Sequence, residues 1–179
     1  FRESPDTAVH ILLDSSGSMT DSGLMLANAV CYAVGKALQG ISGVNLGITA
    51  FPGANTPKRG ATVAPVLRHG EKLTTRFPEI AYGLTPLAES LWWVMQQMCL
   101  LRENRKIILI ITDGEPDSIP AAQEVLRQAR KKGFECYGLG IMCPNITTLL
   151  PHTSRVIERL PQLAPALFEL LEGALRRKA

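Results

Sequence analysis

Two runs of aliphatic residues that each end at an aspartate constrain the fold of this chain most strongly. Residues 107–111 are all isoleucine or leucine and are followed closely by Asp113, and residues 8–13 are nearly as apolar and stop at Asp14. Short continuous apolar runs are typical of strands buried on both faces, as in a parallel sheet. Such strands need helices above and below them, and the sequence therefore predicts an α/β fold.

The rest of the chain alternates between strand and helix patterns. Pro65 interrupts one of the strand patterns, which favours an edge position because proline cannot donate a ladder hydrogen bond. The alternation predicts a doubly wound, mostly parallel sheet of about six strands, with one short antiparallel edge strand and helices on both faces. We expect the further strands at 44–51, 62–68, 136–141 and 155–158, and helices at 24–38, 87–101, 122–129 and 165–176, with a short extra helix before the last strand.

Length and charge agree with a single domain over residues 1–179. The chain has 19 Lys and Arg against 16 Asp and Glu, a net charge of +3. This excess is too small to favour a nucleic-acid partner, for which clustered basic residues are expected. No apolar run approaches the roughly 20 residues of a membrane-spanning helix, so we expect no membrane partner either. The chain begins with Phe1 rather than Met, and we expect it to have been excised from a longer protein.

The cysteines and histidines suggest no zinc or nucleophile site. The four cysteines lack the close spacing of zinc ligands and are interpreted as free core thiols in a reducing compartment, which predicts a cytoplasmic protein. None of the three histidines is paired with a cysteine or a nucleophile motif. His10 lies inside an expected buried strand and is interpreted as a hydrogen-bonded core histidine.

Oxygen-bearing side chains gather where strands end. Asp14, Ser16 and Ser18 follow the first strand, and Asp113 follows the run 107–111. Alternate residues of an extended stretch project to the same side, so one carboxylate and two hydroxyls can converge. Ligands of doubly wound sheets bind beyond the carboxyl ends of the strands, where the strand order reverses. Thr85, just before an expected helix, can add a further oxygen, and such hard donors suit Mg²⁺ better than Zn²⁺.

The pattern has three parts, which are residues 14–18, Thr85 and Asp113, and each part also has a purely structural interpretation. Ser18 or Asp21 could cap the helix that begins near residue 20, and Thr85 could cap the helix that follows it. Asp113 with its following glycine could be an ordinary strand-ending turn, and the acidic residues after it are interpreted as a solvated turn. The occurrence of all three parts in one chain favours a metal site.

The same residues carry a resemblance to a known family. The stretch from Ile11 to Met19 resembles the first motif of the von Willebrand factor type A (VWA) domain. Thr85 resembles the second part and the stretch from Ile110 to Gly114 the third, which together form the metal-ion-dependent adhesion site (MIDAS) of that family. The likeness extends over essentially the whole chain. Within the family the sequence is most similar to the intracellular bacterial branch, whose members work with AAA+ ATPases of the MoxR and metal-chelatase types, notably a cobalt-chelatase subunit.

The resemblance implies a role for each residue. Ser16 and Ser18 would coordinate Mg²⁺ directly, Asp14 and Asp113 would do so directly or through water, and Thr85 would change between the two modes. Mn²⁺ or Ca²⁺ are possible substitutes. An Asp or Glu of a partner protein would fill the remaining position. The implied function is a non-catalytic, Mg²⁺-dependent protein-interaction domain, with an AAA+ ATPase as the expected partner.

Two other functions stay open on the residues alone. A hydrolase could use the same metal to activate water, and a structural domain could leave the site without a metal. Phosphatases of the haloacid-dehalogenase type carry an aspartate where Ser16 stands, so their proton shuttle is missing here. No phosphate-binding P-loop is present, so we do not expect this chain to hydrolyse ATP.

Overall fold

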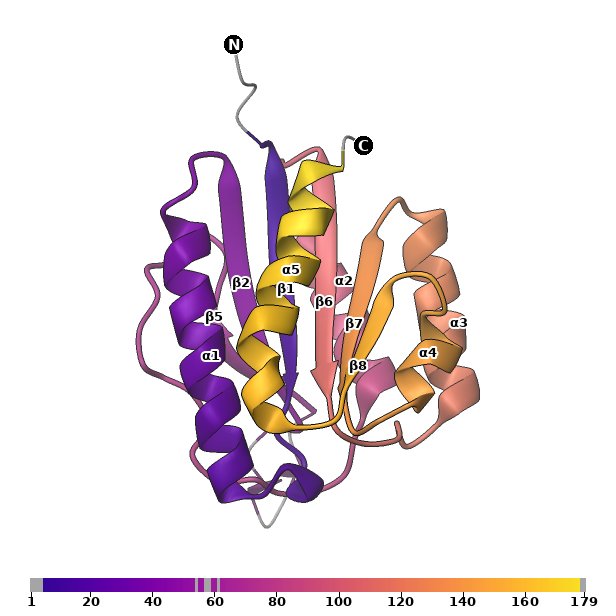
Figure 1. Ribbon diagram of the computed structural model, residues 1–179. Helices are drawn as coiled ribbons and strands as arrows, with labels where there is room; N and C mark the ends of the chain where they lie inside the picture. Colours follow the sequence, from indigo (N-terminus) through magenta and orange to yellow (C-terminus); the bar gives the residue numbers. More distant parts are fainter. Residues whose placement is uncertain (1–4, 54, 57–58, 61, 178–179) are drawn as a thin grey trace.

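The strands form where the aliphatic runs predict them, and together they build one six-stranded sheet (Figure 1). The computed structural model describes residues 5–53, 55–56, 59–60 and 62–177. The strand order is β5-β2-β1-β6-β7-β8, and β5 pairs with β2 in the antiparallel sense while the other pairs are parallel. The predicted fold is therefore confirmed, including the short antiparallel strand at one edge.

The bounds of the elements follow the predicted ranges within a few residues. The sheet consists of β1 (Thr7–Asp14), β2 (Val44–Phe51), β5 (Ala64–Leu67), β6 (Arg105–Thr112), β7 (Glu135–Ile141) and β8 (Ser154–Ile157). The helices are α1 (Asp21–Gln39), α2 (Leu87–Cys99), α3 (Ile119–Lys131), α4 (Asn145–Leu149) and α5 (Leu163–Arg176), with the 3-10 turns η1 (Gly17–Met19) and η2 (Leu160–Gln162). Along the chain, β2 and β5 are separated by a two-stranded ladder of β3 (Asn55–Thr56) and β4 (Arg59–Gly60), where the sequence suggests only a loop.

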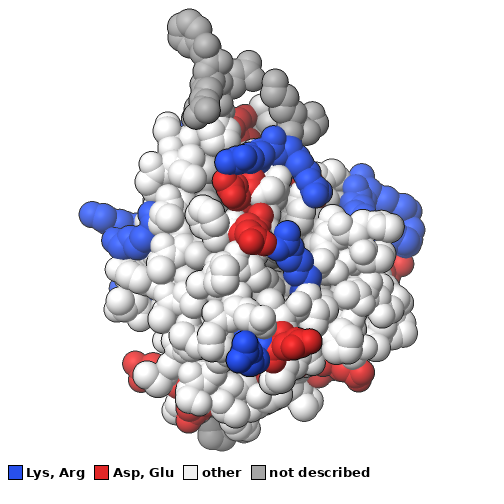
Figure 2. Space-filling view, viewed as in Figure 1, with Lys and Arg blue, Asp and Glu red and all other residues white. Residues whose placement is uncertain are grey.

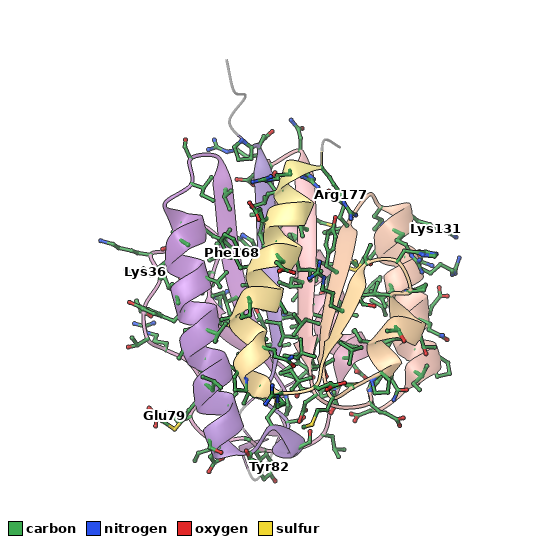
Figure 3. The ribbon with its side chains drawn as sticks, viewed as in Figure 1. Lys36, Glu79, Tyr82, Lys131, Phe168 and Arg177 are labelled. Atoms are coloured by element: carbon green, nitrogen blue, oxygen red, sulfur yellow. The ribbon has the colours of Figure 1, made fainter. Side chains whose placement is uncertain are left out.

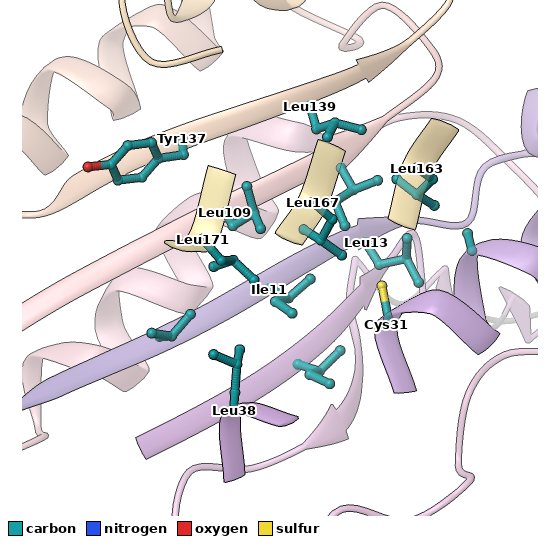
Figure 4. Packing of buried hydrophobic residues seen from close by; sticks show 14 of the residues in the cluster. Ile11, Leu13, Cys31, Leu38, Leu109, Tyr137, Leu139, Leu163, Leu167 and Leu171 are labelled. Atoms are coloured by element: carbon teal, nitrogen blue, oxygen red, sulfur yellow. The ribbon is translucent and has the colours of Figure 1, made fainter. Parts of the chain in front are cut away.

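Side chains of β1 alternate between two apolar layers, one on each face of the sheet. Val9, Ile11 and Leu13 belong to the layer under α1 and α5, which Figure 4 shows from close by. Ala8 and Leu12 belong to the layer under α2, α3 and α4. Because every residue of β1 is buried, and each fully buried large aliphatic side chain contributes about 1.5–3 kcal/mol, this strand is the centre of the core.

The face covered by α1 and α5 carries charges of both signs (Figure 2). Lys and Arg side chains on this face lie beside Asp and Glu side chains. In α5, Glu169 pairs with Arg155 and Glu172 pairs with Arg176. Exposed pairs of this kind contribute about 0–1 kcal/mol each. Among the described residues, no helix combines the length and the apolarity that a bilayer span demands.

The strand order reverses beside β1. The chain goes from β1 through α1 to β2 on one side, and later from α2 to β6 on the other side of β1. Figure 1 shows the carboxyl ends of these strands at the bottom, at the end of the molecule opposite to the last turn of α5. A crevice at such a reversal is where doubly wound sheets bind their ligands.

Candidate metal centre at the carboxyl edge of the sheet

The fold brings the five predicted ligand residues to this edge. Asp14 ends β1 and is fully buried, Ser16 stands just before η1 and is also buried, and Ser18 is exposed within η1. Asp113 follows β6 and is half-buried, and Thr85 is a buried residue shortly before α2. We call these five residues the edge cluster.

Hydrogen bonds link four members of the edge cluster into one network. The Ser16 backbone N–H donates to Asp14 Oδ1 at 2.7 Å, and the Ser16 and Ser18 hydroxyl oxygens are 3.2 Å apart. Ser18 Oγ donates to Asp113 Oδ1 at 2.7 Å. Thr112 Oγ1 donates to Asp14 Oδ2 at 2.6 Å, which fixes the carboxylate of Asp14 from the neighbouring strand. Asp14, Ser16 and Ser18 therefore converge as expected, although Ser18 does so from the 3-10 turn η1 and not from an extended stretch.

Thr85 reaches the same place through a different set of contacts. A Cβ built on Gly114 would lie 3.5 Å from Ser18 Oγ and 3.6 Å from Thr85 Oγ1, so both hydroxyls face the turn after β6. The Thr85 N–H donates to Asp117 Oδ1 at 2.9 Å, and the Asp117 N–H donates to the Thr85 carbonyl at 2.9 Å. This reciprocal pair holds the backbone of Thr85 against the turn that carries Asp113.

Backbone contacts also fix the turn after β1. The Gly17 N–H donates to the Gly83 carbonyl at 3.1 Å, and the Tyr82 N–H donates to the Ser15 carbonyl at 3.0 Å. Ser15 Oγ donates to the Phe51 carbonyl at 3.2 Å, at the end of β2. The loop before α2 and the end of β2 therefore hold the turn on two sides.

The capping alternatives for these residues are wrong. The side chain at the N-terminus of α1 that accepts a hydrogen bond belongs to Thr20, which accepts from the Gly23 N–H at 3.3 Å. Pro86 occupies the N-cap position of α2, and no side chain caps that helix. Neither Ser18 nor Thr85 therefore serves as a helix cap, and both hydroxyls are available to the edge cluster.

The surroundings of Asp14 and Asp113 disfavour the negative charge of their carboxylates. Burial raises the pKa of Asp14 above its ordinary value, and the negative charge of Asp113 adds to this rise, while hydrogen bonds from Ser16 and Thr112 oppose it. Burial likewise raises the pKa of Asp113, and the Ser18 hydroxyl opposes that shift. Among the ion pairs of the described residues, none includes either carboxylate. A buried charge without a partner is costly, so this edge favours a cation.

The donor set of the edge cluster fits a hard divalent cation. Two carboxylates and three hydroxyls are oxygen donors, which Mg²⁺, Mn²⁺ and Ca²⁺ prefer, whereas a structural zinc site would use Cys and His. Within the described part of the chain, no group of three or more His, Cys, Asp or Glu side chains could hold a metal ion. Any metal at this edge would therefore depend on the serine and threonine hydroxyls.

The sequence did not reveal three residues that support the edge cluster. Asp117 is interpreted from the sequence as part of a solvated turn, yet it pairs with the backbone of Thr85. Thr112 and Ser15 are next to predicted ligands in the sequence. Nothing in their spacing indicates that the Thr112 hydroxyl binds Asp14 or that the Ser15 hydroxyl binds the end of β2. Their position next to a predicted ligand is the one available signal.

Comparison with solved structures identifies several proteins of similar fold. Proximal thread matrix protein 1 from the mussel byssus, solved with a zinc-occupied MIDAS motif, has a TM-score of 0.76 and 11% sequence identity, covering 94% of this chain and 46% of that one. The pilus adhesin SpaC of Lactobacillus rhamnosus GG has a TM-score of 0.80 and 14% identity, covering 98% and 30%. The manganese-loaded TRAP protein of Plasmodium vivax has a TM-score of 0.68 and 12% identity, covering 94% and 74%.

These likenesses concern the fold, because all of the identities are low. The chain spans about half the length of the mussel protein and less than a third of the adhesin. A comparison with curated protein sequences gave no match. The family model of the von Willebrand factor type A domain matches residues 8–165, from β1 to the beginning of α5. This match covers most of the chain, including every residue of the edge cluster, and the chain therefore belongs to the von Willebrand factor type A domain family.

Proposed function

We propose that this domain binds a divalent cation at the edge cluster and uses it to capture an acidic side chain of a partner protein. The observation that carries the proposal is the convergence of two carboxylates and three hydroxyls at the strand reversal, with no ion pair to a described Lys or Arg. Mg²⁺ is the proposed ion, and Mn²⁺ or Ca²⁺ are proposed substitutes. The zinc-occupied MIDAS motif of the mussel protein and the manganese-loaded TRAP protein support a divalent metal in this fold.

Simple charge arithmetic supports an acidic partner group. Two carboxylates neutralise a divalent ion at most, and the hydroxyls of Ser16, Ser18 and Thr85 add no charge. Because Mg²⁺ retains exchangeable waters in its six-oxygen shell, an incoming carboxylate can replace one of them. We propose that an Asp or Glu of the partner takes this role, and that the domain binds without catalysing a reaction.

The surface around the edge cluster is suited to a protein partner. Leu84, directly before Thr85, is 74% exposed, and Met142, directly after β7, is 71% exposed. Ile80 and Tyr82 are exposed in the same loop as Leu84, and Figure 3 shows Tyr82 at this end of the molecule. Exposed apolar side chains next to a polar centre are typical of protein interaction sites.

Metal binding is tested first, by thermal unfolding of metal-free protein with and without Mg²⁺. An ion that binds only the native state at 100 times its Kd stabilises it by about 2.7 kcal/mol, which for this chain length corresponds to about 5–10 °C. We expect this shift in the wild type and none in Asp113→Ala. Glu79→Gln changes an exposed carboxylate outside the edge cluster and is expected to keep the shift. Equal shifts in all three proteins would contradict the proposed site.

Partner binding is tested by selecting random displayed peptides on the domain in Mg²⁺ and eluting them with EDTA. We expect every selected peptide to contain an Asp or Glu whose change to Asn or Gln abolishes binding, and Asp14→Ala to bind none of them. Selected peptides without an acidic residue would contradict the carboxylate proposal. Phosphoester turnover that disappears in Asp113→Ala would instead support a hydrolase.

A finer proposal concerns the partner and the location. Its support is the sequence likeness to the intracellular bacterial branch, and it places the domain in the cytoplasm with a MoxR- or chelatase-type AAA+ ATPase. We expect wild-type domain to co-elute with such an ATPase in Mg²⁺ buffer, and Asp14→Ala to elute separately. Co-elution of the ATPase with both the wild type and Asp14→Ala, or with neither, would contradict this finer proposal.

A further inference from the structure

A second buried polar network lies outside the edge cluster and connects three parts of the sheet. His10 in β1 has its Nδ1 atom 2.8 Å from His69 Nε2 and its Nε2 atom 2.7 Å from Thr49 Oγ1 in β2. His69, in the turn after β5, has its Nδ1 atom 3.2 Å from the Asn45 carbonyl oxygen. The network runs from the central strand to the edge of the sheet.

While both rings are neutral, the carbonyl at one end fixes the direction of every hydrogen bond. A carbonyl oxygen can only accept, so His69 Nδ1 must carry a proton and donate it. In a neutral ring, His69 Nε2 is then an acceptor, so His10 Nδ1 must donate to it. His10 Nε2 is left as the acceptor for the Thr49 hydroxyl. When both imidazoles are neutral, each therefore carries its proton on Nδ1.

The network continues beyond the histidines to a carboxylate. Asn45 Oδ1 accepts from the Gly70 N–H at 3.1 Å, and Asn45 Nδ2 donates to Glu103 Oε1 at 3.0 Å. The other carboxylate oxygen of Glu103 is buried and has no hydrogen-bond partner in the described part of the chain. The 68–70 turn is thus attached to β2 through one asparagine and to β1 through one pair of imidazoles.

The backbone of β2 lies close against the imidazole pair. A Cβ built on Gly47 would lie 2.5 Å from both His10 Nδ1 and His69 Nε2, so the glycine in β2 makes room for the pair. His10 and His69 both line a cavity of about 270 Å³ with residues of α2, and His10 is buried whereas His69 is only partly buried. His69 is therefore the more accessible of the two rings to protons.

Few charged groups face this pair. Arg68 lines the same cavity, Glu103 acts on His69 through its charge, and α2 contributes only Trp93 and Gln97 to the lining. Burial lowers the pKa of His69, and the Asn45 carbonyl and Glu103 oppose this shift. Burial also places the pKa of His10 well below its ordinary value, and the charge of a protonated His69 would lower it further.

Protonation breaks the directional network. A proton on His69 Nε2 places a charge on a partly buried ring and requires His10 to move its own proton from Nδ1 to Nε2; a second proton places two N–H donors against each other across the 2.8 Å contact. A proton on His10 Nε2 requires the Thr49 hydroxyl to rotate and accept it, and where Nδ1 is protonated as well it places a charge in the buried core. The unfolded or opened chain takes up protons near pH 6.5, whereas the closed pair resists them to lower pH. The network therefore contributes its full stability above about pH 6.5 and loses it as the pH falls.

We propose that the His10–His69 pair is an acid-sensitive latch, which holds the 68–70 turn against the sheet while both imidazoles are neutral and releases it when they are protonated. Other contacts remain in place after release, because the Leu73 N–H donates to Gln39 Oε1 at 3.2 Å and involves no titratable group. Residues 68–86, all of which the structure describes, contain no helix or strand. This segment connects the 68–70 turn to Gly83 and Thr85. The latch itself requires no metal.

The first test is nitrogen NMR of the imidazoles in metal-free wild-type protein at pH 7.5. We expect both His10 and His69 to carry their proton on Nδ1. Exposed His152 is the internal control, because no directional network constrains it. A proton on Nε2 of His10 or His69, or a charged ring at this pH, would overturn the latch. This test does not depend on the folding of any variant.

The second test measures amide protection factors, corrected for the intrinsic pH dependence of exchange, between pH 7.5 and 5.5. Uptake of one proton on opening predicts that protection of the Gly70 amide falls by up to tenfold per pH unit below about pH 6.5. The Leu73 amide is expected to keep its protection. His152→Gln should behave as the wild type, and His69→Gln should lose the pH dependence. Protection at Gly70 that does not change with pH, or that changes equally in His69→Gln, would overturn the proposal.

Discussion

His10 and Asp14 are both buried polar residues of β1, and their surroundings differ in one decisive respect. Both nitrogens of His10 meet partners of the correct donor or acceptor type, so its network is complete without any added group. Asp14 accepts two hydrogen bonds but lies near a second carboxylate, with no described cation beside either. A complete network holds elements together, whereas an incomplete one is suited to binding.

The largest expected effect comes from removing His10. His10→Ala leaves Thr49 Oγ1 and His69 Nε2 without their partners and creates a cavity in the core. We expect the free energy of unfolding to fall by about 3 kcal/mol in urea denaturation without metal. The matched change His152→Ala, at an exposed site, is expected to alter it by less than about 0.5 kcal/mol. A loss below about 1 kcal/mol for His10→Ala would mean that the network does not stabilise the fold.

Two glycines allow a matched comparison of the space in each network. Gly47→Ala would place a methyl group 2.5 Å from both imidazoles, and we expect it to cost about 1–3 kcal/mol. Gly114→Ala would place its methyl group 3.5 Å from Ser18 Oγ, an ordinary contact, and we expect a change below about 1 kcal/mol. Urea denaturation of the metal-free proteins measures both values. Equal costs would remove the contrast between a closed and an open network.

The smallest expected effect on stability comes from Asp14→Asn in metal-free protein. Asparagine keeps an oxygen for the Ser16 N–H and removes a buried charge whose pKa is raised by burial. We expect the free energy of unfolding at pH 7 to change by less than about 1 kcal/mol, toward greater stability. A loss of more than about 2 kcal/mol, measured in the same urea experiment, would show that Asp14 stabilises the fold and is not held ready for a cation.

The edge cluster shows how far reasoning from sequence extends. Asp14, Ser16 and Ser18 follow one strand at alternate positions, so their convergence depends on local geometry and could be predicted. Asp113 could be placed beside them because parallel strands end at the same edge. The alternative in which Ser18 or Asp21 caps α1 is wrong, and the sequence could not exclude it because Ser18, Thr20 and Asp21 are all chemically able to cap a helix. The backbone conformation after η1 places Thr20 at the N-cap position of α1.

The supporting contacts could not be predicted, because they join residues far apart in the chain. Asp117 meets Thr85 only because the loop before α2 and the turn after β6 lie against each other at the strand reversal. His10 could be interpreted as a hydrogen-bonded core residue, and this is confirmed. Its partner His69 carries no sequence signal, since the pairing depends on where the edge strand β5 ends.

The sequence by itself determined the order along the chain of the helices and of the six strands of the main sheet, the two buried faces of β1 and the side chains that gather at the carboxyl edge. These depend on apolar periodicity and on the end of each strand, which are local properties of the chain. Only the tertiary structure decided which hydroxyl faces which carboxylate, how Thr85 is held, and that two histidines form one directional network. Hydrogen bonds between distant side chains need both position and donor direction, and these are set only when the strands are in register.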